Sequence, residues 1–361
     1  MCDSSLGLSN IVTKTCIIGS LVIFWISLSS RFGKRYNNTK KKFPVAEILL
    51  KGCIMILSAS RRTDIPCYFS EWFMNRIREG YVLSRNPMNY NQISRIALSP
   101  NVVDCIVFWT KDAANILPYL DELDGLGFRY YFQYTITPYG CQLEKNLREK
   151  SGIEDSFVEL SRRIGRERVV WRYDPVLYTE GVDFAYHREH FVRMCEKLAA
   201  YSDTVMVSFI DIYAKVKSSG LRALREDEMT ELAEFFRVTA KEYGIRASAC
   251  CERSELLPEG MEMEACIDRR RVERICGYSL ALPSEKNQRD GCRCCASVDI
   301  GAYNSCVNGC VYCYANRGTS GAEKYLRSHN PKGELLVGTL LEGEKVSVRK
   351  VESHRIFRQE L

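Results

Sequence analysis

Six short runs of β-branched and aromatic residues alternate with amphipathic stretches along the middle of the chain. The runs cover residues 54–60, 102–110, 129–137, 168–173, 204–210 and 245–250. Two of the stretches between them carry apolar residues at helical spacing and stop at a glycine: Ile153, Phe157, Leu160 and Ile164 before Gly165, and Met229, Leu232, Phe236 and Ala240 before Gly244. Alternation of this kind is typical of βα units, so the pattern predicts an α/β fold with a parallel sheet or barrel.

Polar residues gather at the ends of the six predicted strands: Arg61, Arg62, Asp64, Thr110, Lys111, Asp112, Thr135, Thr137, Arg172, Asp174, Ser208, Asp211 and Glu252. In a barrel the carboxyl ends of the strands form the rim that carries the active site. Strand ends also need polar caps where they emerge into solvent. Repetition over six strands nevertheless favours a ligand-binding rim.

Two further segments have patterns of their own. Residues 81–98 predict a hairpin or excursion around Asn86-Pro87. The tail after Asn330 has alternating apolar residues and predicts a small hairpin, the residues being Leu335, Val337, Val346 and Val348.

Length and charge exclude some classes of protein. A chain of 361 residues with 46% hydrophobic content can bury the core of one large barrel-type domain plus appendages. Residues 1–54 hold eight of the 51 basic residues and two of the 45 acidic ones, so the rest of the chain carries 43 of each sign. Because the body has no net charge, a nucleic-acid partner is not expected.

The N-terminal 54 residues stand apart from this pattern. Residues 16–28 are apolar or small, but this run is shorter than the ~20 residues that span a bilayer, and its basic flank follows it instead of preceding it. Met55 stands directly at the first strand. Two interpretations stay open: an extension produced by a wrong start codon, or a weak membrane anchor that leaves the body in the cytoplasm.

The chain has 17 cysteines, of which ten lie between Cys250 and Cys313. An odd total with no secretory signal favours a reducing compartment, where clustered thiols bind metals instead of forming disulfides. We therefore expect a cytoplasmic protein with at least one metal centre.

The strongest local signal is Cys306-x3-Cys310-x2-Cys313, with the aromatic Tyr312 before the last cysteine. Three thiolates of one tight loop can bind three irons of a 4Fe-4S cluster and leave the fourth iron open to a cofactor or substrate. Structural zinc prefers paired C-x2-4-C knuckles with four closed ligands. The spacing thus favours an iron-sulfur cluster over zinc or incidental thiols.

Other cysteines are less specific. Cys292 with Cys294 or Cys295, together with Cys250, Cys251, Cys266 and Cys276, are candidates for an auxiliary cluster or a zinc site. Burial as small apolar side chains explains them equally well, and core packing suffices for Cys67, Cys105, Cys141 and Cys195. His187 and His190 are expected on the solvated face of a helix.

Several blocks together are similar to the family called domain of unknown function 1848, over residues from about 55 to about 330. They are SASRRTDIP (58–66), RNPMN (85–89), VVDCIVFWTK (102–111), RRIGRERVVWRYDPV (162–176), KNQR (286–289) and DIGAYNSC to YCYAN (299–316). The resemblance implies a C-terminal cysteine cluster like the N-terminal one of radical S-adenosylmethionine (SAM) proteins, with no established reaction. Members begin near the position of Met55, in line with the start-codon interpretation.

The order of the parts differs from an ordinary radical SAM barrel, in which the three-cysteine loop follows the first strand. Here a strand expected at 297–303 leads into the loop late in the chain. A circular permutation would reconcile the two, with this late strand in the place of the first and residues 54–60 as the second. The expected organisation is an extension at 1–54, a barrel body at 55–265, a Cys-rich segment at 266–330 that completes the barrel, and a tail at 331–361.

A weaker similarity, to the spore photoproduct lyase group of radical SAM proteins, rests on residues 63–66, Thr110-Lys111, Asp174-Pro175 and the GCxYCYA core. It implies that Asp64 and Lys111 face SAM or substrate, and Arg172 and Asp174 complete the candidate catalytic set. No GGE-type SAM motif is evident. The expected function is a radical SAM-type enzyme that receives electrons from a flavodoxin or ferredoxin; the alternative is a non-catalytic iron-sulfur or zinc protein.

Overall fold

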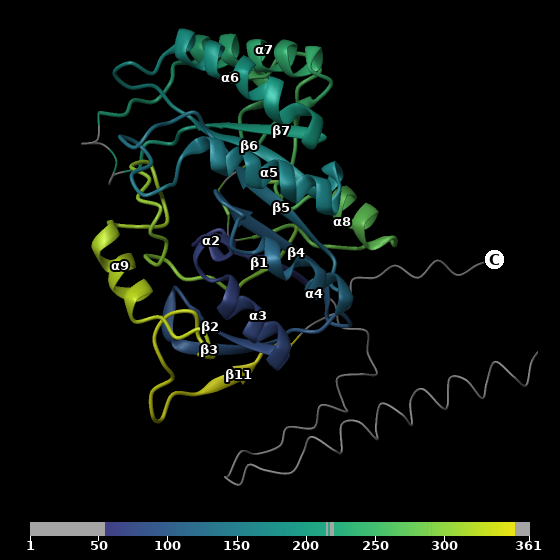
Figure 1. Ribbon diagram of the computed structural model, residues 1–361, viewed down its shortest axis with the longest axis vertical. Helices are drawn as coiled ribbons and strands as arrows, with labels where there is room; N and C mark the ends of the chain where they lie inside the picture. Colours follow the sequence, from purple (N-terminus) through teal and green to yellow (C-terminus); the bar gives the residue numbers. More distant parts are fainter. Residues whose placement is uncertain (1–54, 214–215, 217–219, 287, 290, 351–361) are drawn as a thin grey trace, which may run out of the picture. The chain divides into compact units, whose positions relative to one another are not determined.

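A parallel eight-stranded sheet with the order β10-β1-β4-β5-β6-β7-β8-β9 organises the chain (Figure 1). The computed structural model describes residues 55–213, 216, 220–286, 288–289 and 291–350. The sheet strands are β1 (Met55–Ala59), β4 (Val103–Thr110), β5 (Tyr130–Thr135), β6 (Val169–Val176), β7 (Thr204–Phe209), β8 (Arg246–Ala249), β9 (Glu262–Met263) and β10 (Val298–Asp299). All six strands predicted from the sequence are present, and the prediction of a parallel α/β fold is confirmed.

Helices connect the strands, as βα units require. They are α2 (Ile65–Tyr68), α3 (Ser70–Glu79), α4 (Leu120–Gly125), α5 (Lys150–Ile164), α6 (Phe184–Leu198), α7 (Glu226–Glu242), α8 (Arg269–Cys276) and α9 (Thr319–Arg327). The two helices predicted from apolar spacing correspond to α5 and α7, whose buried residues include Phe157 and Phe236. Each helix ends beside a glycine with a positive φ, Gly165 or Gly244.

The two faces of the sheet are covered by different parts of the chain. Alternate strand residues such as Phe108, Phe132 and Trp171 belong to one core together with residues of α3, α5, α6 and α7. The residues between them, including Val107 and Tyr131, form a second core with α8 and with cysteines of the segment 250–295. The Cys-rich segment and α8 therefore cover this face of the sheet along β1, β4, β5, β6 and β7, and we call it the inner face.

The late strand lies next to the first described strand of the chain. Strand β10 lies at the edge of the sheet and pairs in parallel with β1, with Leu57 opposite Val298 and Ser58 opposite Asp299. Only these two of the residues expected at 297–303 form the strand. The sheet is an open one in the described part of the chain, because β9 and β10 occupy its two edges.

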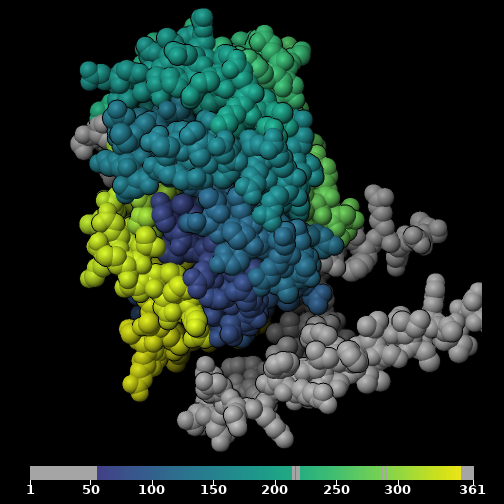
Figure 2. Space-filling view, viewed as in Figure 1, coloured from purple at the N-terminus to yellow at the C-terminus, as the bar shows by residue number. Residues whose placement is uncertain are grey.

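The hairpin predicted at 81–98 is confirmed as the antiparallel pair β2 (Tyr81–Asn86) and β3 (Asn89–Ala97). The hairpin expected in the tail is wrong. Strand β11 (Val346–Val348) adds to β3 in parallel, and Leu335 bridges to Leu83, so the apolar tail residues complete a sheet begun far earlier in the chain. Figure 2 shows this C-terminal part, in yellow, packed against the N-terminal part of the described chain, in purple.

Two other expectations are wrong. His187 is fully buried on α6, where its ring nitrogens contact the Tyr173 hydroxyl at 2.8 Å and the Leu177 carbonyl at 2.9 Å. Cys141, assigned to the core, is exposed, whereas Cys67, Cys105 and Cys195 are buried. The alternatives for residues 1–54, the apolar run 16–28 included, lie outside the described residues. Within those that are described, no helix has the length and apolar character to cross a membrane.

Candidate functional site: a cavity between two cysteine groups

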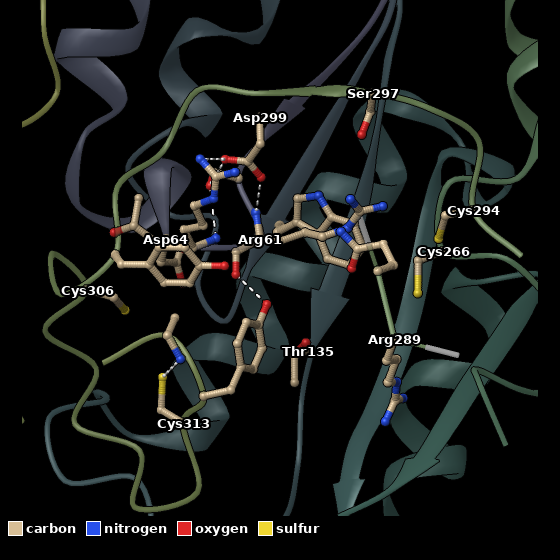
Figure 3. Close-up of a pocket in the computed structure, with 18 of the residues that line it drawn as sticks. Arg61, Asp64, Thr135, Cys266, Arg289, Cys294, Ser297, Asp299, Cys306 and Cys313 are labelled. Carbon is tan, nitrogen blue, oxygen red and sulfur yellow. Dashed lines mark hydrogen bonds and ion pairs between the residues drawn. The ribbon is translucent and has the colours of Figure 1, made fainter. Parts of the chain in front are cut away.

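A cavity of about 720 Å³ opens at the carboxyl ends of the strands. It is lined by most of the polar rim predicted from the sequence: Arg61, Arg62, Asp64, Thr110, Lys111, Thr135, Arg172, Asp174, Ser208 and Asp211. Asp112, Thr137 and Glu252 do not line it. Cys306, Cys310, Cys313 and Tyr312 border the cavity, and so do Cys250, Cys266, Cys292 and Cys294. The fold has therefore brought two cysteine groups, predicted separately, to one cavity (Figure 3).

The loop after β10 carries the first group. Cys306 is buried, and Cys310 and Cys313 keep part of their surface exposed. Burial raises the pKa of the Cys306 thiol well above its ordinary value and that of Cys310 to about 12, although the Lys111 ammonium group acts in the opposite direction on Cys310. The amide of Ala315 donates to the Cys313 sulfur at 3.3 Å (Figure 3).

Glu144 anchors this loop from the neighbouring connection after β5. Its buried carboxylate accepts hydrogen bonds from Lys111 Nζ at 2.7 Å, from Lys150 and from the Tyr312 hydroxyl. Burial opposes its charge, but the two lysines outweigh this and lower the pKa of Glu144 to about 2. The backbone of Glu144 also bridges to that of Cys310, so this residue fixes both the chain and the charges around the loop.

Asp64 fixes the other side of the loop. Its carboxylate accepts from the amides of Cys67 and Lys111, from the Thr110 hydroxyl and, at 3.2 Å, from the side-chain amide of Asn308. Burial raises the pKa of Asp64 to about 6, although these four donors oppose the shift. Because both of its oxygens are engaged by the protein, the structure gives Asp64 the geometry of a positioning residue.

Asp299 docks β10 onto β1. Its carboxylate accepts from the hydroxyls of Ser58 and Ser60 at 2.9 and 2.6 Å and from the amides of Arg61 and Gly301, both at 2.9 Å (Figure 3). The loop begins a few residues later, so this carboxylate sets where the loop leaves the sheet.

The second group comes from three separate segments on the inner face. Cys250 follows β8, Cys266 follows β9, and Cys292 and Cys294 precede β10. The sulfurs of Cys250 and Cys266 are 2.9 Å apart, and the amide of Ile267 donates to the Cys294 sulfur at 3.4 Å. Of the other candidates, Cys276 points elsewhere and donates to the Asp104 carbonyl at 3.4 Å.

Two arginines that line the cavity have their guanidinium groups over the Trp109 ring. The Arg172 guanidinium lies 5.5 Å from the Trp109 ring and that of Arg61 lies 5.2 Å from it. Arg172 pairs with Asp174 and donates to the Cys266 sulfur at 2.9 Å. The predicted residues Arg172 and Asp174 thus form an ion pair that faces the second cysteine group.

The loop cysteines fit a 4Fe-4S cluster by their chemistry: three thiols of one loop border a cavity, and a lysine lies beside Cys310. No group of three or more His, Cys, Asp or Glu side chains in the described residues is arranged so that it could hold a metal ion. A cubane cluster does not require that arrangement, because each thiolate binds a different iron and the sulfurs stand farther apart than the ligands of one ion.

Sequence reasoning missed several residues that shape the site. Glu144 stands in no strand or motif, and only its burial beside two lysines identifies it. Asn308 and Asp299 lie inside the recognised block 299–316, but their roles depend on contacts with β1 and Asp64 across more than 200 positions. The one sequence signal for Asn308 and Asp299 was their position near the loop cysteines.

The family model described as Domain of unknown function (DUF1848) matches residues 56–315. A search of curated proteins gave no match.

Proposed function

The chain belongs to the family called domain of unknown function 1848, and from its site we propose that it is a radical SAM-type iron-sulfur enzyme with a substrate still to be identified. The observation that carries the proposal is the place of the late cysteine loop. Strand β10 pairs beside β1, and the three thiols that follow it border the cavity at the carboxyl ends of the strands. That is the end of a βα sheet where active sites are built.

Cys306, Cys310 and Cys313 would hold the cluster, and the cavity leaves room for SAM and a substrate beside it. When bound, a 4Fe-4S cluster with one open iron supplies an electron that cleaves the sulfonium of SAM reductively. Reduction needs a one-electron donor, for which we propose a flavodoxin or a ferredoxin. The partly exposed Cys310 and Cys313 give such a donor a short path to the site.

The protein's own residues orient and neutralise the loop. Lys111 places an ammonium group near Cys310 and 5.5 Å from the Tyr312 ring, which offsets negative charge on the thiolates. Burial works against that charge, but Glu144 and the Cys310 sulfur outweigh it and raise the pKa of Lys111. Asp64, through Asn308, holds the loop from the opposite side. The carboxylate of Asp174 borders the cavity near the arginines and is a candidate for binding substrate.

The proposal is tested on protein purified without oxygen. We expect about four irons per chain and the visible absorption that is typical of cubane clusters. After addition of SAM and dithionite, we expect 5'-deoxyadenosine. Cys310→Ala should abolish both iron binding and 5'-deoxyadenosine formation. Cys195→Ala is the matched control and should retain both, because Cys195 is buried on α6 and does not line the cavity.

Two outcomes would contradict the enzyme. An iron-sulfur cluster that does not cleave SAM at any donor potential would favour the alternative function, electron transfer. Zinc on the loop without iron would leave a structural metal protein. If the cluster and SAM cleavage are both found, the substrate can be sought by the loss of SAM in the presence of candidate compounds.

A further inference from the structure

We propose that Cys250, Cys266, Cys292 and Cys294 bind one zinc ion through four thiolates, at a second site on the inner face of the sheet. This proposal does not depend on the iron-sulfur enzyme, because the four cysteines belong to other segments than the loop. Four cysteine ligands with no open position are typical of a structural zinc site. Such a site would tie β8, the segment after β9 and the segment before β10 to one point.

The four thiols line one cavity, and two of their sulfurs are in contact. Cys250 and Cys266 are 2.9 Å apart at their sulfurs, and the Cys294 side chain lies close to those of Cys266 and Cys292. Cys250, Cys266 and Cys294 are buried, and Cys292 is partly exposed. An ion can therefore reach the site beside Cys292, while the other three cysteines are held inside the fold.

The charges around these thiols favour a negative centre. Arg172 donates to the Cys266 sulfur at 2.9 Å, and the guanidinium of Arg61 extends toward Cys266 and Cys294 (Figure 3). In the described structure, Arg61 Nη2 and Trp109 Nε1 are buried without a hydrogen-bond partner. A buried Arg172 and a half-buried Arg61 facing neutral thiols are costly, whereas a zinc tetrathiolate carries two negative charges and strong acceptor sulfurs.

The short distance between two of the sulfurs favours a single metal ion over an iron-sulfur cluster at this site. The 2.9 Å between the Cys250 and Cys266 sulfurs leaves no room for a cube of four irons and four sulfides between them, whereas side-chain rotations would let the four thiols surround one ion. The described residues contain no preformed metal-holding group, so the four thiols would have to rotate toward a common point when the ion binds. On binding, the thiol protons leave to solvent and no electron is transferred.

The experiment uses the full chain with Cys306, Cys310 and Cys313 all replaced by serine, so that iron on the loop cannot contribute. After expression with added zinc, we expect about one zinc per chain by mass spectrometry of metals. Cobalt(II) in place of zinc should give the intense charge-transfer absorption of a tetrathiolate centre. Adding Cys292→Ser, at the partly exposed ligand, should weaken zinc binding at least tenfold in competition with a chelator.

Cys276→Ser is the matched control, because Cys276 is buried in the same core but donates to the Asp104 carbonyl. It should leave zinc binding unchanged. Cys292→Ser also keeps the proposal testable if substitution of a buried ligand prevents folding. Iron in place of zinc at these residues, or four thiols that react freely with a thiol reagent in metal-supplemented protein, would overturn the proposal. Neither result depends on whether the loop cleaves SAM.

Discussion

Glu144 shows how strongly a single buried charge can control the site. Its carboxylate is shared by Lys111, Lys150 and Tyr312, all on or beside the cysteine loop. Glu144→Gln keeps the shape but leaves two ammonium groups without their counter-charge. We expect the free energy of unfolding to fall by about 3 kcal/mol and iron retention by the loop to decrease.

The measurements are urea unfolding of the metal-free protein and iron per chain after anaerobic purification. Glu149→Gln is the control, since Glu149 is exposed and lies just five positions further along the chain. If Glu144→Gln unfolds like the unmodified protein, the network around the loop does not contribute to stability as argued.

His187 predicts a dependence of stability on pH that is independent of any metal. Burial lowers its pKa from 6.5 to about 4, so the unfolded chain binds a proton between these values and the folded chain does not. The contribution of His187 is therefore fully present above pH 6.5 and is lost as the pH falls toward 4. From pH 7 to pH 5 we expect a loss of about 2 kcal/mol.

His187→Gln removes the titration and should abolish this part of the loss, as urea unfolding at both pH values can show. Comparison of the two proteins at each pH is essential. Asp64, whose pKa is raised to about 6, acts in the opposite direction and is present in both. An unchanged difference between pH 7 and pH 5 in the variant would show that His187 is not the source.

Residue types at strand ends could be predicted from the sequence, because a strand end in a parallel sheet faces the rim whatever surrounds it. Arg61, Lys111 and Asp174 line the cavity as expected. The contacts of Glu144 could not be predicted, since they depend on which loop packs against the connection after β5. The burial of His187 was missed for a related reason: the charged Arg188 and Glu189 beside it point away from the face that packs on Tyr173.

Gly309 determines the course of the cysteine loop. Its φ is +70°, a conformation that favours glycine, and a Cβ atom there would lie 3.1 Å from the Asn146 side-chain amide and 3.2 Å from Lys145 Cβ. Gly309→Ala should therefore displace the loop from the 143–146 segment. We expect a loss of stability of about 1–2 kcal/mol and a several-fold loss of iron, measured as above.

Gly321→Ala, within α9, is the control because nothing lies within 4 Å of the Cβ position. Alanine in a helix should be neutral or stabilise by up to about 1 kcal/mol. Equal iron content in both variants would show that the loop tolerates a side chain at Gly309.

Elements with a local signal were the ones the sequence could predict: strands of β-branched residues, helices with apolar spacing, and the hairpin β2–β3. Elements held by distant partners could not be derived in the same way. Strand β10 has only two residues in the ladder and is a strand because β1 lies beside it. Strand β11 likewise depends on β3, about 250 positions earlier in the chain, which is why the tail was wrongly expected to pair with itself.

For the molecule as a whole, the late segments complete a sheet that the early ones leave half covered. The inner-face residues Ile56, Val107 and Tyr131 pack against α8 and the cysteines of 266–295, and the Tyr131 hydroxyl donates to the Cys266 carbonyl at 2.7 Å. A chain that ends at Ala265 would expose this apolar face and lose β10. We therefore expect that it aggregates or lacks a cooperative unfolding transition, even though it contains most strands of the sheet. The control is a chain that lacks only residues 351–361, which should keep the unfolding transition unchanged. Both shortened chains are measured by circular dichroism and thermal unfolding. A folded, soluble product ending at Ala265 would contradict this. It would mean that residues 55–265 form a separate domain and that the cysteine segment is an appendage, so that the shared cavity would not be needed for folding.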